Sequence, residues 1–329
     1  MTLRRPLITS CVKCVWIDSY RYKIFLLTIV SVVLGVEGCG LDIARERFAL
    51  PIFRISEETQ LTSGPGDNFY PAWSPDGRRI AFVSIRSGNW DVWVMDNDGS
   101  AQQALTTDSG LDAAPAWSPG GGTIAYASRM LDHQNVTQLL LMDLSGALPK
   151  PASMDPNTKQ LLSAWSPDGR ELAFIAEPMN EPAHWELQVI DIQTARTRTL
   201  VKDRVGFSSL SWHPDGGAIA FVRTASRQTR EIWTITPGGA DLQPILADQT
   251  NNGDPDWSPD GRMLAFSSDR SGHSEIWLLD FTTRRLQQVT THRALARYPR
   301  WGPDGKAIAF TSNRSGRDQI WIMSIESSK

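Results

Sequence analysis

Cysteine is scarce in this sequence, and its position limits the covalent chemistry of the chain. The three cysteines are Cys11, Cys14 and Cys39, so no residue after Cys39 carries a thiol. Disulfide bonds therefore cannot hold together the residues after Cys39, which make up most of the 329-residue chain. With 41% hydrophobic residues overall, the chain is apolar enough to form a core without them.

Recognisable catalytic and cofactor motifs are also missing. The sequence has no G-x-S-x-G nucleophile elbow, because the nearest stretches, GFSSL and GHSEI, lack the closing glycine. It has no P-loop, no dinucleotide-binding fingerprint and no H-E-x-x-H zinc motif. The five histidines do not fall into a metal-binding set, which favours solvated loop histidines. A formal net charge of -3 argues against a nucleic-acid partner, so we expect no cofactor, no metal and no nucleic acid.

One stretch near the N-terminus, IFLLTIVSVVLGV (Ile24–Val36), is strongly apolar and follows a basic segment. This order indicates an export signal, because the run is shorter than the ~20 residues that cross a bilayer. The run leads into VEGC, which resembles a bacterial lipobox ending in an acylated cysteine, here Cys39. We predict a lipoprotein signal peptide at 1–38 and a tether at 39–53. The mature protein is then expected in the periplasm or at the surface of a bacterial cell, anchored to the membrane through Cys39.

One motif recurs six times along the rest of the chain. Each copy starts with a tryptophan, which is followed by proline two residues later and glycine four residues later. Successive copies are 44 to 48 residues apart, a period typical of repeat architectures. The six tryptophans are Trp73, Trp117, Trp165, Trp212, Trp257 and Trp301.

Each copy contains the pattern of four short strands. Proline, aspartate and glycine after the tryptophan favour a tight turn, and the Ile-Ala-Phe-like segment that follows favours a buried strand. Four antiparallel strands per copy predict a propeller blade, so the fold class is an all-β, six-bladed β-propeller over residues 54–329. The sixth copy lacks a fourth strand, whereas TQLTSG (Thr59–Gly64) precedes the first copy. We expect this N-terminal strand to complete blade six and close the ring.

The repeat PAWSPDGRRIAFVSIRSGNWDVWVMDNDGSAQQALT (Pro71–Thr106) resembles the repeats of the C-terminal propeller of TolB. The resemblance covers all six copies and implies a TolB-like, WD-repeat-like propeller in an exported protein. TolB has a separate α/β domain ahead of its propeller, and the ~15 residues between Cys39 and the first strand are too few for one. Similar repeats form the gating propellers of prolyl-oligopeptidase-type peptidases and the body of some oligogalacturonate lyases.

The segment before each tryptophan varies between copies, whereas the turn after it does not. Binding sites favour variable segments on a rigid frame, so we place the candidate site there, at the mouth of the central channel. One and three residues before the tryptophan, blades two to four are small or apolar, and blades five, six and one are mostly polar or aromatic. The residues that stand out are Tyr70, Asp254, Asp256, Tyr298 and Arg300. We predict that they form a recognition patch; the alternative is that Asp256 and Arg300 merely pair and Tyr70 caps the core.

Several functions are compatible with such a patch. We favour an envelope-anchored scaffold that binds a protein or a peptide, with a glycan as another possible ligand. The alternatives are a lyase or hydrolase that acts on a polysaccharide, with Asp254 and Asp256 as acid and base, and the accessory propeller of a peptidase. A structural subunit without a ligand is a further alternative. The missing motifs favour binding over catalysis, and the question of enzymatic activity stays open.

Overall fold

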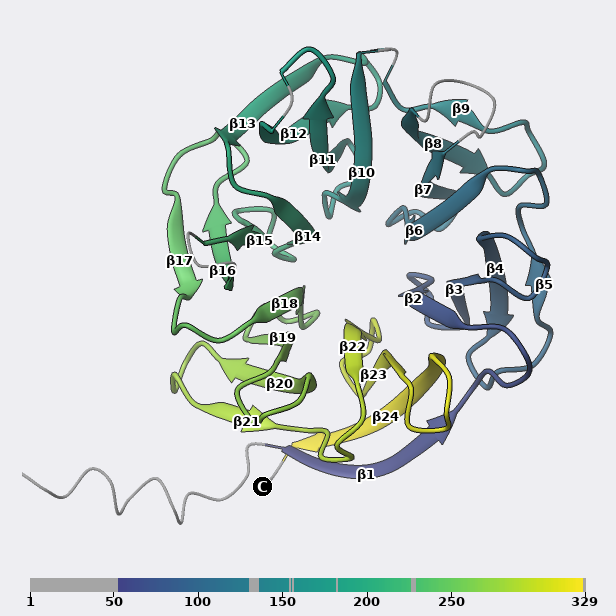
Figure 1. The fold of residues 1–329 in the computed structure, drawn as a ribbon, viewed down its shortest axis with the longest axis vertical. Helices are drawn as coiled ribbons and strands as arrows, with labels where there is room; N and C mark the ends of the chain where they lie inside the picture. The colour runs from purple at the N-terminus through teal and green to yellow at the C-terminus, as the bar shows by residue number, and fades with distance from the viewer. Residues whose placement is uncertain are drawn as a thin grey trace, which may run out of the picture. The chain divides into compact units, whose positions relative to one another are not determined.

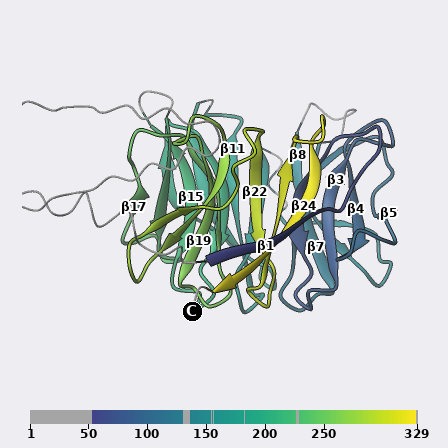
Figure 2. The ribbon, with the colours of Figure 1, turned by 90° about the horizontal axis from the view of Figure 1, so that it is seen from below.

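The computed structural model describes residues 53–327 apart from 130–135, 154, 156, 182 and 226–228. Within these residues every regular element is a β-strand, and the strands form six four-stranded sheets. Figure 1 shows the sheets arranged as blades around a central axis, and Figure 2 shows the strands running between the two faces of the ring. The six-bladed β-propeller predicted from the repeat is confirmed.

The four strands of a blade come from the four segments of one repeat. The innermost strands, which end at the repeat tryptophan, are β2 (Asn68–Trp73), β6 (Leu111–Trp117), β10 (Thr158–Trp165), β14 (Phe207–Trp212), β18 (Asn252–Trp257) and β22 (Ala296–Trp301). The second strands are β3 (Arg79–Ser84), β7 (Thr123–Arg129), β11 (Glu171–Pro178), β15 (Ile219–Thr224), β19 (Met263–Ser268) and β23 (Ala307–Ser312). The third strands are β4 (Asp91–Asp96), β8 (Thr137–Asp143), β12 (Trp185–Asp191), β16 (Arg230–Ile235), β20 (Glu275–Asp280) and β24 (Gln319–Ser327). The outer strands are β5 (Gln103–Ala104), β9 (Lys150–Pro151), β13 (Thr197–Asp203), β17 (Gln243–Leu246), β21 (Leu286–Gln288) and β1 (Phe53–Gln60).

The turn between the first two strands of a blade is built by its own side chains. In blade one the Ser74 hydroxyl donates to Asp76 Oδ1 at 2.6 Å, and the Arg79 backbone N–H donates to Ser74 Oγ at 2.9 Å. Gly77 takes the left-handed backbone conformation, with φ of 69°, that this turn requires. The recurring Ser-Pro-Asp-Gly sequence therefore serves the frame, as the comparison of the copies predicts.

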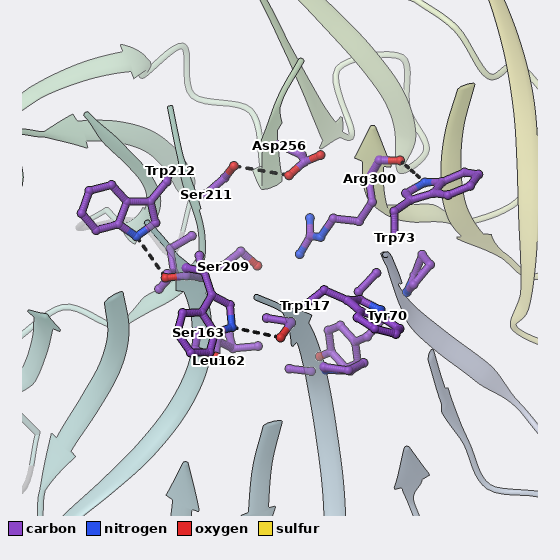
Figure 3. Close-up of a pocket in the computed structure, with 18 of the residues that line it drawn as sticks. Tyr70, Trp73, Trp117, Leu162, Ser163, Ser209, Ser211, Trp212, Asp256 and Arg300 are labelled. Atoms are coloured by element: carbon purple, nitrogen blue, oxygen red, sulfur yellow. Dashed lines mark hydrogen bonds between the residues drawn. The ribbon is translucent and has the colours of Figure 1, made fainter. Parts of the chain in front are cut away.

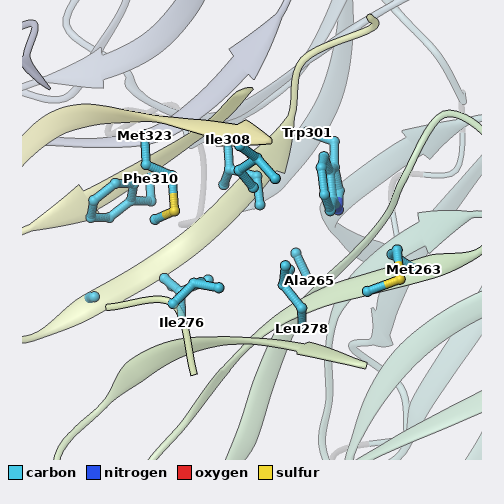
Figure 4. Close-up of a cluster of buried hydrophobic side chains, with 11 residues drawn as sticks. Met263, Ala265, Ile276, Leu278, Trp301, Ile308, Phe310 and Met323 are labelled. Atoms are coloured by element: carbon cyan, nitrogen blue, oxygen red, sulfur yellow. The ribbon is translucent and has the colours of Figure 1, made fainter. Parts of the chain in front are cut away.

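The blades pack through apolar side chains of their inner and middle strands. Figure 4 shows the interface between blades five and six, where Ile276 and Leu278 of β20 face Ile308, Phe310 and the nearby Met323. All five side chains are fully buried, because residues from both adjoining sheets fill the space between them.

Three of the repeat tryptophans, Trp73, Trp165 and Trp212, also link neighbouring blades through hydrogen bonds. Trp73 Nε1 donates to the backbone carbonyl of Arg300 at 3.1 Å, and Trp212 Nε1 donates to that of Ala164 at 3.0 Å. Each of these bonds joins a blade to the preceding one, at the residue directly before its repeat tryptophan. The tryptophan therefore fixes the position of the residue that the sequence singles out as variable.

The N-terminal strand closes the ring on the last blade, as predicted. Strand β1 pairs antiparallel with β24, from Phe53 opposite Ser327 to Gln60 opposite Trp321 (Figure 1). Beyond the strand, the Thr62 hydroxyl donates to Gln319 Oε1, at the start of β24, at 2.8 Å. Thr106 in blade one and Thr290 in blade five make the same contact with the first residue of their third strand. β1 begins six residues before Thr59, because β24 is long enough to pair with it over that length.

The predicted signal peptide at 1–38 and the predicted anchor Cys39 lie outside the described residues, as does the tether at 39–53 apart from Phe53. In the part of the chain that the structure describes, no helix is long and apolar enough to span a membrane.

Candidate binding site at the channel mouth

A β-bulge precedes the repeat tryptophan in every innermost strand, and the sequence alone did not reveal it. The register of each inner pair shifts there, for example between Phe69 and Ala72 and between Arg297 and Arg300. The residue three positions before the tryptophan has positive φ in five of the blades: Tyr70 (55°), Ala114 (51°), Ser209 (41°), Asp254 (53°) and Tyr298 (54°). Such a conformation costs a non-glycine residue roughly 1–2 kcal/mol, so the surrounding strands must hold it in place. The bulge increases the local twist and re-aims these side chains.

A cavity of about 270 Å³ lies in the channel, and residues of all six innermost strands line it. Figure 3 shows its wall, with Tyr70, Asp256 and Arg300 among the labelled residues. Three of the five predicted site residues therefore line one cavity. Tyr298 and Asp254 do not line it, but both contact the neighbouring wall residues.

Tyr70 and Tyr298 form an aromatic pair that joins blades one and six. Their ring centroids lie 4.2 Å apart with an interplanar angle of 40°. The guanidinium carbon of Arg297 lies 5.4 Å from the Tyr298 ring centroid and is held by an ion pair with Asp318 at 2.8 Å. Burial raises the pKa of both phenols, so both rings stay neutral at physiological pH.

Asp254 is a buried carboxylate that holds three blades together. Its side chain accepts hydrogen bonds from the hydroxyls of Ser209 at 2.9 Å and Ser267 at 2.8 Å. It also accepts a longer bond, 3.4 Å, from the backbone N–H of Tyr298. With only 5% of its surface exposed, Asp254 positions the tyrosine pair from behind.

Asp256 and Arg300 lie in the same part of the wall without forming a direct ion pair. Asp256 accepts from the Trp301 backbone N–H at 2.8 Å and from the Ser211 hydroxyl at 3.3 Å. Burial raises the pKa of Asp256, although the charge of Arg300 opposes the shift. Among the described residues no carboxylate lies within 4.0 Å of the Arg300 guanidinium, whose Nη1 donates to the Pro299 carbonyl at 2.9 Å. The pairing considered as the alternative is thus electrostatic at most, and the cation remains available.

A second, more apolar cavity of about 330 Å³ adjoins the first, and sequence comparison missed it. Tyr70, Ala114 and Leu162 line both cavities, and Trp90 and Leu111 line the second alone. Trp90 is 40% exposed and makes an edge contact with Phe69 at 5.0 Å between centroids. Trp90 lies in a turn whose length differs between blades, so no alignment of the copies could single it out.

The site has the composition of a recognition surface. It offers Arg300 at the channel cavity, Arg129 at the apolar one, the neutral phenols of the tyrosine pair, small hydroxyls and an apolar recess, mostly on strands. Within the described residues no three histidine, cysteine or acidic side chains are grouped so that they could hold a metal ion.

The fold and the site together define the class of protein: it is a six-bladed β-propeller built from Trp-x-Pro-x-Gly repeats, with a small cavity in its central channel. The chain belongs to the TolB β-propeller domain family, whose model matches residues 48–182 and 172–329. It is similar to the Tol-Pal system protein TolB of Alcanivorax borkumensis, with 31% identity over 102 residues. That match covers 31% of this chain and 24% of that protein, so it spans about a quarter of that relative's length.

Solved structures show the same fold. The chain is similar to TolB from Acinetobacter baumannii, with a TM-score of 0.63 and 21% identity over 74% of this chain and 59% of that chain. It is also similar to oligogalacturonate lyase from Vibrio parahaemolyticus, with a TM-score of 0.59 and 16% identity over 81% of this chain and 93% of that chain. At these identities the likeness concerns the fold alone.

Proposed function

We propose that the protein is an exported, membrane-anchored scaffold of the cell envelope that binds a protein or peptide at the mouth of its central channel. The observation that carries the proposal is the convergence of Tyr70, Asp256 and Arg300 on one cavity, with Tyr298 and Asp254 directly behind. Membership in the TolB propeller family and the export signal predicted at 1–38 support the envelope location.

The chemistry of the wall suits a peptide. The Arg300 guanidinium presents donors that a carboxylate of the partner can accept, and the tyrosine pair offers a rigid amphipathic surface. Tyrosine and arginine dominate the energetics of many protein interfaces, because they bury a large area and still satisfy polar groups. The strained bulges hold these groups before the partner arrives, which reduces the ordering cost of binding.

Binding is favoured over polysaccharide cleavage by the state of the two aspartates. Each accepts hydrogen bonds that join neighbouring blades, Asp254 from two hydroxyls and a backbone N–H and Asp256 from a hydroxyl and a backbone N–H. A pair of carboxylates acting as acid and base would both have to face the substrate, and Asp254 does not line the cavity. Turnover of a polysaccharide that is abolished by Asp256→Asn would support the enzyme alternative and contradict this proposal.

The test is a comparison of partner binding by variants of the full chain. A partner is first captured from envelope extract, identified by mass spectrometry and purified, and its dissociation constant is then measured directly. Arg300→Ala and Tyr298→Phe should weaken binding, the first by more than about tenfold because a charged partner would lose its counterion. The matched control is Arg78→Ala, an exposed arginine in the first-to-second strand turn of blade one. Equal affinity of Arg300→Ala and wild type would place the interface elsewhere.

Anchoring is tested separately, so that its failure leaves the binding site untouched. Mass spectrometry of the mature protein should find a diacylglycerol-modified Cys39 at the N-terminus. Cys39→Ser should move the protein from the membrane fraction into the soluble fraction. An unmodified N-terminal residue other than Cys39 would refute the lipoprotein prediction.

A further inference from the structure

Blade five contains an internal cation site that is filled by its own arginine. The Arg270 guanidinium donates to Ser268 Oγ at 3.0 Å, to Asn252 Oδ1 at 2.9 Å and to Asp248 Oδ2 at 3.1 Å. Relative to the repeat tryptophan, the acceptors stand nine residues before it (Asp248), five before it (Asn252) and eleven after it (Ser268). The arginine stands thirteen residues after it.

The same positions accept a guanidinium in two other blades. In blade one Arg86, also thirteen residues after its tryptophan, donates to Ser84 Oγ at 2.8 Å and to Asn68 Oδ1 at 2.9 Å. In blade four Asp203, nine residues before its tryptophan, is bound by the guanidinium of Arg223, which stands at the position of the serine rather than at that of Arg270. The second and third acceptor positions thus bind a guanidinium in blades one and five, and the first does so in blades four and five.

Blade two has the complete acceptor set but not the arginine. Its residues at the three positions are Asp108, Asp112 and Ser128, which we call the blade-two acidic pocket. The residue thirteen positions after Trp117 is Met130, so the sequence provides no guanidinium there. An aspartate replaces the asparagine of blades one and five, which adds a negative charge where a cation is expected.

The pocket brings its acceptors together, and only Asp108 has a partner, the Gly110 backbone N–H at 2.7 Å. Asp112 and Ser128 are register partners of β6 and β7, and their exposed fractions are 0% and 1%. Among the described residues, no hydrogen bond of good geometry reaches either oxygen of the Asp112 carboxylate or the Ser128 hydroxyl, although the Ser128 and Thr106 hydroxyls lie near enough to Asp112 to lower its pKa slightly. A methyl group placed on Gly110 would lie 2.7 Å from Asp108 Oδ1, 3.1 Å from Ser128 Oγ and 3.4 Å from Asp112 Oδ1, so the three oxygens converge. Buried polar groups of this kind are rare in folded proteins, and each calls for a ligand or a bound solvent molecule.

The pocket is negatively charged, and it reaches the surface through Asp108, whereas Asp112 and Ser128 are buried behind it. Asp108 is exposed, and together with Thr106 and Tyr126 it lines a cavity of about 410 Å³ between blades one and two. Leu148, 91% exposed, lies at the rim of the same cavity and offers an apolar contact. Burial raises the pKa of Asp112 to about 6, against the smaller effect of nearby hydroxyls, and Asp108 and Asp91 raise it further. A guanidinium would relieve this repulsion and satisfy several acceptors at once.

We propose that the blade-two acidic pocket is a second binding site, which receives an arginine side chain from a protein partner in the place that the chain's own arginine takes in blades one and five. The cation site stands on the contacts of this blade; only the assignment of its arginine to a protein partner rests on the proposed function. The site is separate from the channel patch, because Asp112 and Ser128 do not line the channel cavity. A partner would thus contact two regions of the propeller.

The test measures binding of N-acetyl-arginine amide to the full chain by calorimetry at pH 7.5. We expect saturable binding with one site per chain, and much weaker binding of N-acetyl-lysine amide, which lacks the planar donor fork. Asp112→Asn and Asp108→Asn should each lower the affinity for the arginine amide, and the loss of a charged acceptor corresponds to about tenfold. Asp108 is exposed, so its variant should fold even if the Asp112 variant does not.

A second variant serves as the positive control. Arg270→Ala removes the guanidinium from the equivalent set in blade five, so this variant should bind two molecules of the arginine amide per chain. Its melting temperature, lowered by the loss of Arg270, should rise again when the arginine amide is added. The proposal is overturned if wild type shows no saturable binding while Arg270→Ala does, or if Asp108→Asn and Asp112→Asn bind as tightly as wild type. It is also overturned if calcium binds to this pocket and the arginine amide does not. Because none of these measurements involves a partner or Arg300, the outcome is independent of the channel-mouth proposal.

Discussion

Replacing Asp112 with asparagine should stabilise the propeller, and the gain should grow with pH. The pKa of Asp112 rises from 3.8 to about 6 on folding, mainly because the carboxylate loses its hydration. The folded state therefore holds this proton more tightly than the unfolded chain does. Wild-type stability from this group is complete below about pH 4 and is lost as pH rises through about pH 6. The difference of about two pKa units corresponds to about 3 kcal/mol at pH 8 and to about half of that at pH 5.

The assay is urea unfolding of wild type and Asp112→Asn at pH 5 and pH 8, followed by tryptophan fluorescence. The difference between the two proteins cancels every other titrating group, so its change with pH reports Asp112 alone. Asp76→Asn is the matched control, because the Ser74 hydroxyl and the Arg78 N–H lower the pKa of that exposed carboxyl. It should destabilise the protein to a similar extent at both pH values. If Asp112→Asn destabilises the protein more at pH 8 than at pH 5, the carboxylate has a partner and the reasoning fails.

Two further predictions concern the frame of the site. Trp73→Phe should lower the free energy of unfolding by about 1–3 kcal/mol, because the Arg300 backbone carbonyl loses its hydrogen-bond donor, Trp73 Nε1. Trp257→Phe should lower it by less, since Trp257 Nε1 has no hydrogen-bond partner among the described residues. Equal losses for the two variants in chemical denaturation would contradict this difference. Ala114→Gly should stabilise the protein by roughly 0.5–1 kcal/mol by relieving a φ of 51°, whereas Ala116→Gly in the same strand should destabilise it by a similar amount. Thermal melting of both variants measures the signs, and a loss at both positions would show that the bulge is not strained.

The sequence predicted the frame well because the frame is repeated. Six copies of one motif average out the ambiguity of any single strand, and the missing fourth strand of blade six identified its replacement before Trp73. The same comparison found that blades five, six and one differ just before the tryptophan, and the structure brings Tyr70, Tyr298 and Asp254 together there.

What could not be predicted depends on backbone geometry and on contacts between copies. Alanine, serine, aspartate and tyrosine all adopt the positive φ of the bulge, so no residue type at this position marks it in the sequence. The direction in which Tyr70 and Tyr298 point could therefore not be predicted. The guanidinium acceptor set was equally hidden, because its members are spread over more than twenty positions of a repeat and only their hydrogen bonds relate them. Asp112 attracts notice in the sequence only once Arg270 is known to bind the corresponding asparagine.

The pairing of β1 with β24 makes the two ends of the propeller neighbours, with Phe53 directly opposite Ser327. Opposite residues of an antiparallel pair lie only about 5 Å apart, so a short turn could connect them without disturbing either strand. The chain could then be opened in another exposed loop and still form the same ring, as circular permutation requires. The order of the blades in the gene is thus one of several that would encode this molecule, and only the attachment point of the N-terminal segment distinguishes it from the others.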